Sequence, residues 1–237
     1  MKKFTLFAGI LALMVFSTSC LKDKDDYVDV RPTGLVTVYP QEDGSFYMQL
    51  DDKTVLYPTN VKSSPYKDKV VRALVNYTED NSSREPRIES ADEIIKRNVK
   101  VNWMDSIRTK EPVLTKGAED ALVYGNDPIE IMRDWVTVAE DGFLTLRVRA
   151  RWGMSGKKHN INLVSGVNPE NPFEFELRHD ENGDYGVELA DALVAFNLNY
   201  LRNDLSNSEE EVKIKLRWKS FSGDKSTEFD LKMHKEI

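Results

Sequence analysis

The best candidates for chemistry in this sequence are two histidines, His159 and His179. Imidazole nitrogens and carboxylate oxygens are ordinary ligands of divalent ions, and Asp180, Glu181 and Asp184 follow the second histidine closely. If the two segments meet in space, these side chains could form a divalent-ion site. In the alternative interpretation, which we prefer, each histidine caps a strand end and satisfies a local backbone group.

The acidic run from 180 to 184 also has some character of a calcium loop. It reads Asp-Glu-Asn-Gly-Asp, and oxygen-rich loops that contain glycine suit that ion. However, the run lacks the EF-hand spacing, and an Asn-Gly pair between two strands is a strong hairpin signal. We therefore interpret the run as a hairpin turn and expect neither a metal nor a cofactor.

Signatures of catalysis are missing from the sequence. Ser155 lies in Trp-Gly-Met-Ser-Gly, which fails the G-x-S-x-G spacing, and neither H-E-x-x-H nor a P-loop is present. The one cysteine excludes a disulfide framework and a cysteine-based metal centre. We predict no catalytic residue and a protein that is not an enzyme. A hydrolase of unrecognised type that uses scattered carboxylates is the alternative.

Aromatic and basic side chains could contact a ligand without catalysis. Among the four tryptophans, Trp135 and Trp218 lie on the apolar phase of expected strands and should be core residues, as Trp103 also could be. Trp152 lies between glycines and basic residues and is the best candidate for exposure. The basic residues form a stripe that could meet an anionic partner or form one solvated sheet face: Arg147, Arg149, Arg151, Lys157 and Lys158.

The N-terminus has the layout of a secretory signal peptide. Lys2 and Lys3 precede 13 mostly apolar residues, whereas a membrane span needs about 20. Small residues then precede Cys20, which resembles a bacterial lipobox, although serines occupy positions 17 and 19, where leucine and glycine or alanine are usual. We predict a signal peptide over 1–19 and lipidation of Cys20. A buried free cysteine near an ordinary cleavage site is the alternative.

The mature chain is acidic. Cleavage before Cys20 removes Lys2 and Lys3 and no acidic residue, so the formal net charge changes from −7 to −9. A chain of that charge is repelled by phosphate backbones, so we expect no nucleic acid partner.

Residues 32–112 read as β-strands with one short helix. Strands are expected over 35–39, 45–50, 54–57, 69–77 and 99–103, and the Asp-Gly at 43–44 predicts a hairpin turn. The capping box at 90–93 predicts a helix around 91–97. That order of elements is compatible with a five-stranded barrel of the OB type. Residues 110–128, rich in proline and glycine, read as a connector.

Residues 113–237 repeat the β signal. Short alternating segments are separated by turns at 139–142, 179–185 and 222–224. Expected strands cover 135–138, 143–150, 159–164, 173–178, 186–189, 194–200 and 212–219, with a last one around 229–231. Such spacing predicts an antiparallel β-sandwich with one face of each sheet in water. The predicted fold class is therefore all-β, a small OB-type barrel followed by a β-sandwich.

This layout resembles the NigD-like lipoproteins of gut and oral anaerobes. The resemblance covers the mature chain and rests on CLKDKDD at 20–26, the hairpin at 127–153, the strand at 157–164 and the hairpin at 175–184. It implies a lipoprotein signal, an N-terminal OB-type domain and a C-terminal β-sandwich. The family has no established activity, so no catalytic residue carries over. Its name derives from a gene near a bacteriocin cluster, which suggests a bacteriocin-associated or immunity factor as an alternative function.

The residues after Cys20 bear on localisation. Residues 20–31 form an acidic tether, and acidic runs in this place resemble the signal that exports lipoproteins of these anaerobes to the cell surface. Lys22 and Lys24 interrupt the run, so the periplasmic face of the outer membrane is the alternative. Asp-Ser-Ile at 105–107 resembles an O-glycosylation site, which makes Ser106 a candidate. We expect an outer-membrane binding or structural module that contacts the membrane through its lipid and has an envelope protein or a glycan as its partner.

The prediction for Cys20 can be checked on the natural product. Mass spectrometry of the protein from its own cells should find a mature chain that begins at Cys20 and carries fatty acid. An N-terminus at any other residue, or a Cys20 free of acyl chains, would contradict the cell-envelope interpretation.

Overall fold

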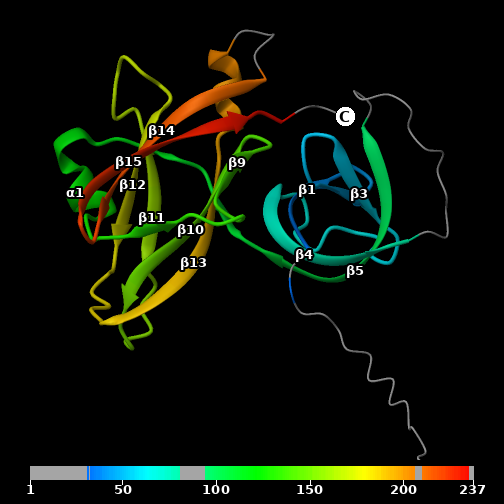
Figure 1. Cartoon of the computed structure of the whole chain (residues 1–237), viewed down its shortest axis with the longest axis horizontal. Helices are drawn as coiled ribbons and strands as arrows, with labels where there is room; N and C mark the ends of the chain where they lie inside the picture. Colours follow the sequence, from blue (N-terminus) through cyan, green and yellow to red (C-terminus); the bar gives the residue numbers. More distant parts are fainter. Residues whose placement is uncertain (1–30, 32, 81–93, 206–209, 235–237) are drawn as a thin grey trace, which may run out of the picture.

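The computed structural model describes residues 31, 33–80, 94–205 and 210–234. They form two β domains side by side, a barrel and a sandwich (Figure 1). The predicted signal peptide, Cys20 and nearly all of the tether lie outside the described residues. Within the described residues, no helix combines the length and the apolar character needed to cross a bilayer.

Five strands close the N-terminal barrel in the order β1-β2-β3-β5-β4. Their bounds are β1 (Gly34–Pro40), β2 (Phe46–Gln49), β3 (Thr54–Pro58), β4 (Val71–Glu79) and β5 (Ile95–Ser106). The predicted turn joins β1 to β2, which pair antiparallel. Alternate residues point inward and form an apolar core that includes Val36, Val38, Met48, Leu56 and Val75. The predicted five-stranded OB-type barrel is confirmed.

The predicted helix around 91–97 is wrong where the structure describes it. Ile95, Lys96 and Arg97 belong to β5 and pair in parallel with β3, Thr54 opposite Ile95 and Leu56 opposite Arg97. A barrel closes only when each strand finds a neighbour on both sides. Pairing with β3 therefore overrides the local helix signal, which tertiary context often does.

The C-terminal domain is a sandwich of two sheets. One has the order β6-β13-β10-β8, with β9 also on β10, and the other has the order β15-β14-β12-β11-β7. The strands are β6 (Arg108–Lys110), β7 (Val113–Leu114), β8 (Glu130–Met132), β9 (Val138–Glu140), β10 (Phe143–Trp152), β11 (Asn160–Ser165), β12 (Glu174–Asp180), β13 (Glu188–Asn197), β14 (Glu211–Ser220) and β15 (Gly223–Lys232). Short helices η1 (Gly117–Glu119), α1 (Asp120–Tyr124) and η2 (Asn199–Asp204) lie between strands. The predicted β-sandwich is confirmed.

The predicted hairpin around Asn182 and Gly183 is wrong, because the strands on either side belong to different sheets. β12 pairs with β11 and β14, whereas β13 pairs with β10. Phe175 contributes to the core from one sheet and Phe196 from the other, so the chain must cross between the sheets at 181–187. A local Asn-Gly signal indicates a turn but does not say which strand the chain joins next.

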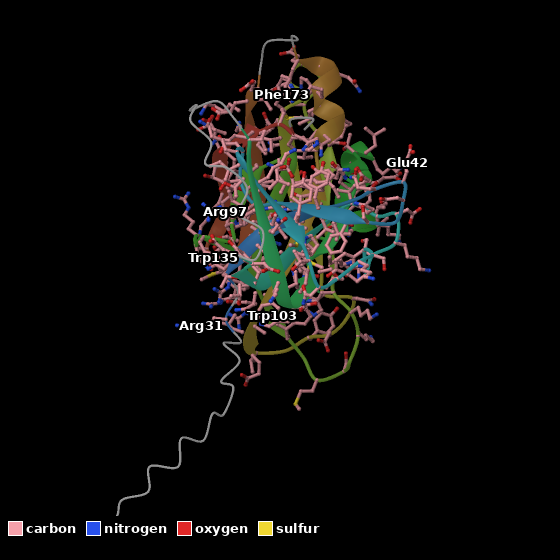
Figure 2. All side chains as sticks on the ribbon, turned by 90° about the vertical axis from the view of Figure 1, so that its right-hand side faces the viewer. Arg31, Glu42, Arg97, Trp103, Trp135 and Phe173 are labelled. Carbon is pink, nitrogen blue, oxygen red and sulfur yellow. The ribbon has the colours of Figure 1, made fainter. Side chains whose placement is uncertain are left out.

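We predicted that Trp135 is a core residue, and this prediction is also wrong. Its exposed fraction is 57%, and it lies at the surface in Figure 2. Asp134 starts a turn here: its side chain accepts a hydrogen bond from the backbone N–H of Val136 at 3.1 Å, so β9 begins only at Val138. Trp218, by contrast, is buried as predicted.

One buried arginine joins the two domains. Arg72, on β4 of the barrel, is 1% exposed. Its guanidinium donates to Thr37 Oγ1 in the barrel at 2.9 Å and, across the interface, to Thr145 Oγ1 at 3.2 Å and Glu140 Oε1 at 2.5 Å. A buried charge is tolerated when its hydrogen bonds and its counter-charge are in place. Arg72 therefore fixes the barrel against β9 and β10.

Apolar and polar contacts complete this interface. A cluster contributed by both domains includes Leu35, Ile107, Val136 and Ala195. At another point Tyr39 Oη donates to Asp141 Oδ2 at 3.0 Å, and burial is the main cause that raises the pKa of Tyr39. With both kinds of contact, the two domains form one unit.

Replacing Arg72 tests whether it holds the domains together. Arg72→Ala leaves Glu140 and two buried hydroxyls without their partner, so we expect the free energy of unfolding to fall by about 3 kcal/mol or more. Urea denaturation measures it. Arg97→Ala is the matched control, because Arg97 pairs with Glu79 at an exposed site and should cost less than about 1 kcal/mol. Equal costs for the two variants would refute the role of Arg72.

Candidate binding tip of the β-sandwich

Two segments meet at the end of the sandwich where β10 stops and β13 starts, toward the lower left of Figure 1. We call residues 153–158 and 181–187 the sandwich tip. Trp152 pairs with Glu188, and the backbones beyond them touch: a Cβ on Gly186 would lie 1.8 Å from the carbonyl oxygen of Trp152. Only glycine permits this approach, so the two segments are packed directly on each other.

Asp184 holds the two segments of the tip together. Its carboxylate is buried and accepts hydrogen bonds from the backbone N–H of Gly153 at 2.9 Å, the N–H of Ser155 at 3.0 Å and the hydroxyl of Ser155. These donors favour the charged form, and those of Ser155 contribute most. They lower the pKa of Asp184 from 3.8 to about 2. An ionised carboxylate in the second segment thus fixes the backbone of the first.

The two histidines extend this network into the sandwich. His159 Nε2 lies 3.3 Å from Asp184 Oδ2, His159 Nδ1 lies 2.9 Å from His179 Nε2, and His179 Nδ1 lies 3.2 Å from the carbonyl oxygen of Pro128. Burial, followed by the nearby His159, lowers the pKa of His179. A neutral His179 must donate from Nδ1 to Pro128 and accept at Nε2. The hydrogen bond between His159 Nδ1 and His179 Nε2 therefore has His159 as its donor.

The structure brings His159, His179 and Asp184 together, whereas the preferred interpretation of the sequence had each histidine capping its own strand end. The remaining acidic candidates lie in other contacts: Asp180 Oδ2 accepts from Asn160 at 3.2 Å, and Glu181 donates its backbone N–H to Asp127. The imidazole nitrogens face one another, Asp184 and a backbone carbonyl rather than a common centre. Across the described residues, no group of three or more His, Cys, Asp or Glu side chains could hold a metal ion.

Around this polar network, the tip exposes large apolar side chains. Met154, Tyr185 and Val187 are 102%, 82% and 77% exposed, and Leu189, at the start of β13, is 55% exposed. Contiguous exposed apolar residues on a soluble domain often mark an interaction site. Sequence reasoning missed them because it placed 186–189 in a strand and Met154 in an unassigned loop. Apolar residues inside a turn-rich segment were the available signal.

Trp152 and a small pocket lie beside the tip. The indole stacks on His159 with ring centroids 3.8 Å apart and donates from Nε1 to the carbonyl oxygen of Ala190 at 3.1 Å. A pocket of about 250 Å³ is lined by Trp152, by Lys157 and Lys158 of the tip, and by residues of β6, β11 and β13.

The predicted basic stripe is largely neutralised along β10. Arg147 pairs with Asp134 at 2.6 Å and with Asp191 at 2.5 Å, and Arg149 pairs with Asp191 at 2.6 Å. Asp191 is on β13, opposite Arg149 in the sheet, which no local sequence signal reveals. The structure thus pairs these arginines internally, unlike the lysines of the tip.

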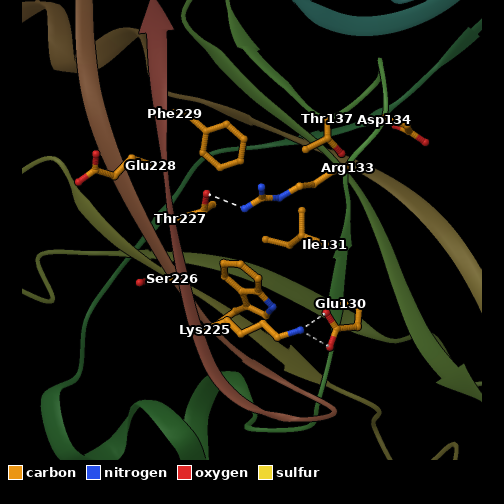
Figure 3. Close-up of a pocket in the computed structure, with 11 residues that line it drawn as sticks. Glu130, Ile131, Arg133, Asp134, Thr137, Lys225, Ser226, Thr227, Glu228 and Phe229 are labelled. Carbon is orange, nitrogen blue, oxygen red and sulfur yellow. Dashed lines mark hydrogen bonds and ion pairs between the residues drawn. The ribbon is translucent and has the colours of Figure 1, made fainter.

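A larger groove of about 700 Å³ runs between the two sheets, next to β8 and β15 (Figure 3). Ile131 and Phe229 point into it, and two links cross it: Lys225 Nζ to Glu130 Oε2 at 3.1 Å, and Arg133 Nη2 to Thr227 Oγ1 at 3.2 Å. Glu130 and Lys225 neutralise each other and Arg133 is held by Thr227, so this groove is a weaker ligand site than the tip.

The other predicted sites are distant from the tip or not described. Ser106 is exposed at the last residue of β5 in the barrel. Cys20 lies outside the described residues.

The low pKa of Asp184 predicts how stability depends on pH. Its folded-state pKa, about 2, is below 3.8, so the carboxylate adds stability that is present above pH 4 and is lost as the pH falls toward 2. Thermal denaturation of Asp184→Asn should give a lower Tm than the parent at pH 7, with the difference shrinking between pH 4 and pH 2. The exposed Asp68→Asn is the control and should follow the parent. A constant difference at every pH would contradict this role of Asp184.

Comparison with known proteins places both domains. Residues 35–107 match the NigD-like N-terminal OB domain and residues 111–231 match the NigD-like C-terminal beta sandwich domain. No curated protein matches the chain.

Solved structures share the architecture of the whole described chain. A provisionally assigned toxin-related protein from Parabacteroides distasonis is 27% identical, with a TM-score of 0.65, over 84% of this chain and 92% of its own. A NigD-like immunity protein from Bacteroides caccae is 18% identical (TM-score 0.54, 85% and 92% coverage), and a provisionally assigned lipoprotein from Bacteroides fragilis is 14% identical (TM-score 0.54, 85% and 98% coverage). With matches to both domain models in the same order, the chain belongs to the NigD-like family.

Proposed function

We propose that this protein is a lipid-anchored, non-catalytic binding module of the outer membrane, and that the sandwich tip is its contact surface. The observation that carries the proposal is the display of Met154, Tyr185 and Val187 in solvent on a backbone fixed by Asp184. Exposed apolar side chains carry a solvation cost, which binding to a partner removes. A rigid surface also loses little conformational entropy when it binds.

The hydrogen bonds of the tip support binding rather than catalysis. Nucleophilic attack by a serine needs a base that can take up the hydroxyl proton, and the pKa of Asp184, about 2, is too low for that role. The hydroxyl of Ser155 donates to Asp184, and His159 lies between Asp184 and His179. These groups are therefore engaged in holding the tip, and their arrangement does not suit attack on a substrate.

The N-terminal sequence supports the anchor. Cys20 follows an apolar stretch too short to span a membrane, and its surroundings resemble a lipobox apart from Ser17 and Ser19. The structural neighbour from Bacteroides fragilis is itself described as a lipoprotein. A protein held at the membrane in this way would meet an envelope protein or a glycan, at the cell surface or, in the alternative, at the periplasmic face.

A bacteriocin-associated or immunity function is the second candidate. Its support is the NigD-like immunity protein from Bacteroides caccae, which shares both domains. Such a factor would also act by binding, so the two candidates differ in the partner. Sensitivity of a deletion strain to a bacteriocin encoded beside the gene would favour this candidate.

Photo-crosslinking in intact cells tests the tip as a contact surface. A crosslinker at position 185 should capture a reproducible partner, whereas one at the equally exposed Leu122 of α1 should not. The pair Tyr185→Ser and Val187→Ser should weaken the isolated complex by about tenfold or more, because tyrosines are often hot spots of an interface and both changes remove apolar contact area. Leu122→Ser with Val123→Ser is the matched control. Equal capture at 185 and 122 would refute the proposal.

A further inference from the structure

The pocket beside the tip has the chemistry of an anion site. We propose that it binds the carboxylate of an acidic sugar, one residue of a glycan, with the ring against its apolar and aromatic lining. The inference names the ligand class of a pocket that adjoins the proposed contact surface. It rests on the proposed function only for its biological setting.

Four cationic side chains surround the pocket: Arg108 and Lys110 from β6, and Lys157 and Lys158 from the tip. Its lining contains no acidic residue. Within the described part of the chain, none of the four forms an ion pair. In a protein of net charge −7, a pocket lined by four unpaired cations is a local exception that attracts anions.

The hydrogen bonds of Lys110 also lack an acidic acceptor. Its ammonium donates to the carbonyl oxygen of Ile161 at 2.5 Å and to Asn162 Oδ1 at 2.7 Å, and both acceptors are neutral. Burial, followed by the like charge of Arg108, lowers the pKa of Lys110. A half-buried cation beside a second cation is unfavourable unless an anion compensates it. A bound carboxylate would therefore compensate the unfavourable charge at this site.

The neighbouring arginines provide an internal contrast. Arg147 and Arg149 lie on the same sheet, and the fold supplies Asp134 and Asp191 to neutralise them. The sheet therefore neutralises these two arginines internally. The cations around the pocket are left for a partner from outside.

The shape of the pocket indicates the rest of the ligand. Its volume of about 250 Å³ is below the 300–1,000 Å³ typical of drug-sized ligands, so it accommodates one ring rather than a cofactor. Ile161 and Leu193 add apolar side chains to the lining, Trp152 adds an aromatic ring and Asn160 an amide. An apolar and aromatic surface suits the C–H face of a sugar ring, and the cations suit its carboxylate.

Calorimetry on the mature chain, purified from membranes in detergent, tests the proposal with glucuronate as the probe. Glucuronate should bind and glucose should not. The pair Arg108→Gln and Lys158→Gln should weaken binding about tenfold or more. The pair Lys62→Gln and Lys67→Gln removes the same charge at exposed sites of the barrel and should leave binding unchanged.

Thermal denaturation gives an independent measurement of the site. Without ligand, Arg108→Gln should have a Tm equal to or above that of the parent, because it removes repulsion with Lys110. Glucuronate should raise the Tm of the parent and not that of the variant. A lower Tm for ligand-free Arg108→Gln would mean that Arg108 is structural, against the proposal.

The remaining outcomes each decide the inference. Inorganic phosphate that binds as tightly as glucuronate would overturn the sugar, and so would an acidic peptide that binds where glucuronate does not. Crosslinking at position 185 without glucuronate binding would refute the ligand class alone. Glucuronate binding without crosslinking would refute the tip as contact surface and leave the pocket standing.

Discussion

The arrangement of the two domains depends on the hydrogen bonds and the ion pair that the buried guanidinium of Arg72 forms. A charge removed from water is stable only if the fold provides a counter-charge and hydrogen-bond acceptors. Here those partners come from both domains: Thr37 from the barrel, Thr145 and Glu140 from the sandwich. If the domains separated, these groups would lose their partners and would have to form hydrogen bonds with water instead. The arrangement is therefore fixed by directional bonds, and the surrounding apolar cluster adds affinity without direction.

A second buried charge has the same effect at the far end of the sandwich. Asp184 gathers N–H and O–H donors from the opposite segment, and the two histidines connect it to the sandwich interior. Side chains that looked like metal ligands in the sequence therefore act as structural supports. Their hydrogen bonds hold the backbone on which Met154 and Tyr185 are exposed.

Ion pairing also distinguishes two kinds of surface site. At some sites the charged side chains pair with one another, and at another the cations have no acidic partner among the described residues. Arg147 and Arg149 find carboxylates within the sandwich, and the 700 Å³ groove is crossed by its own ion pair and hydrogen bond. The pocket beside Trp152 keeps four cations without a carboxylate. The pocket adjoins the apolar tip, because Lys157 and Lys158 of the tip belong to its lining.

The sequence by itself determined the fold class, because alternation with period two and Asp-Gly turns are local properties that a β-strand and its hairpin express directly. It also identified the histidines and Asp184 as candidates. Only the tertiary structure decided that residues 95–97 form a strand, that the chain crosses between sheets at Asn182, and that Trp135 is exposed. It also decided which cations find carboxylates. These outcomes depend on pairings between residues far apart in the chain, such as Arg149 with Asp191, and the spacing of residues along a sequence carries no information about which distant partner will be adjacent.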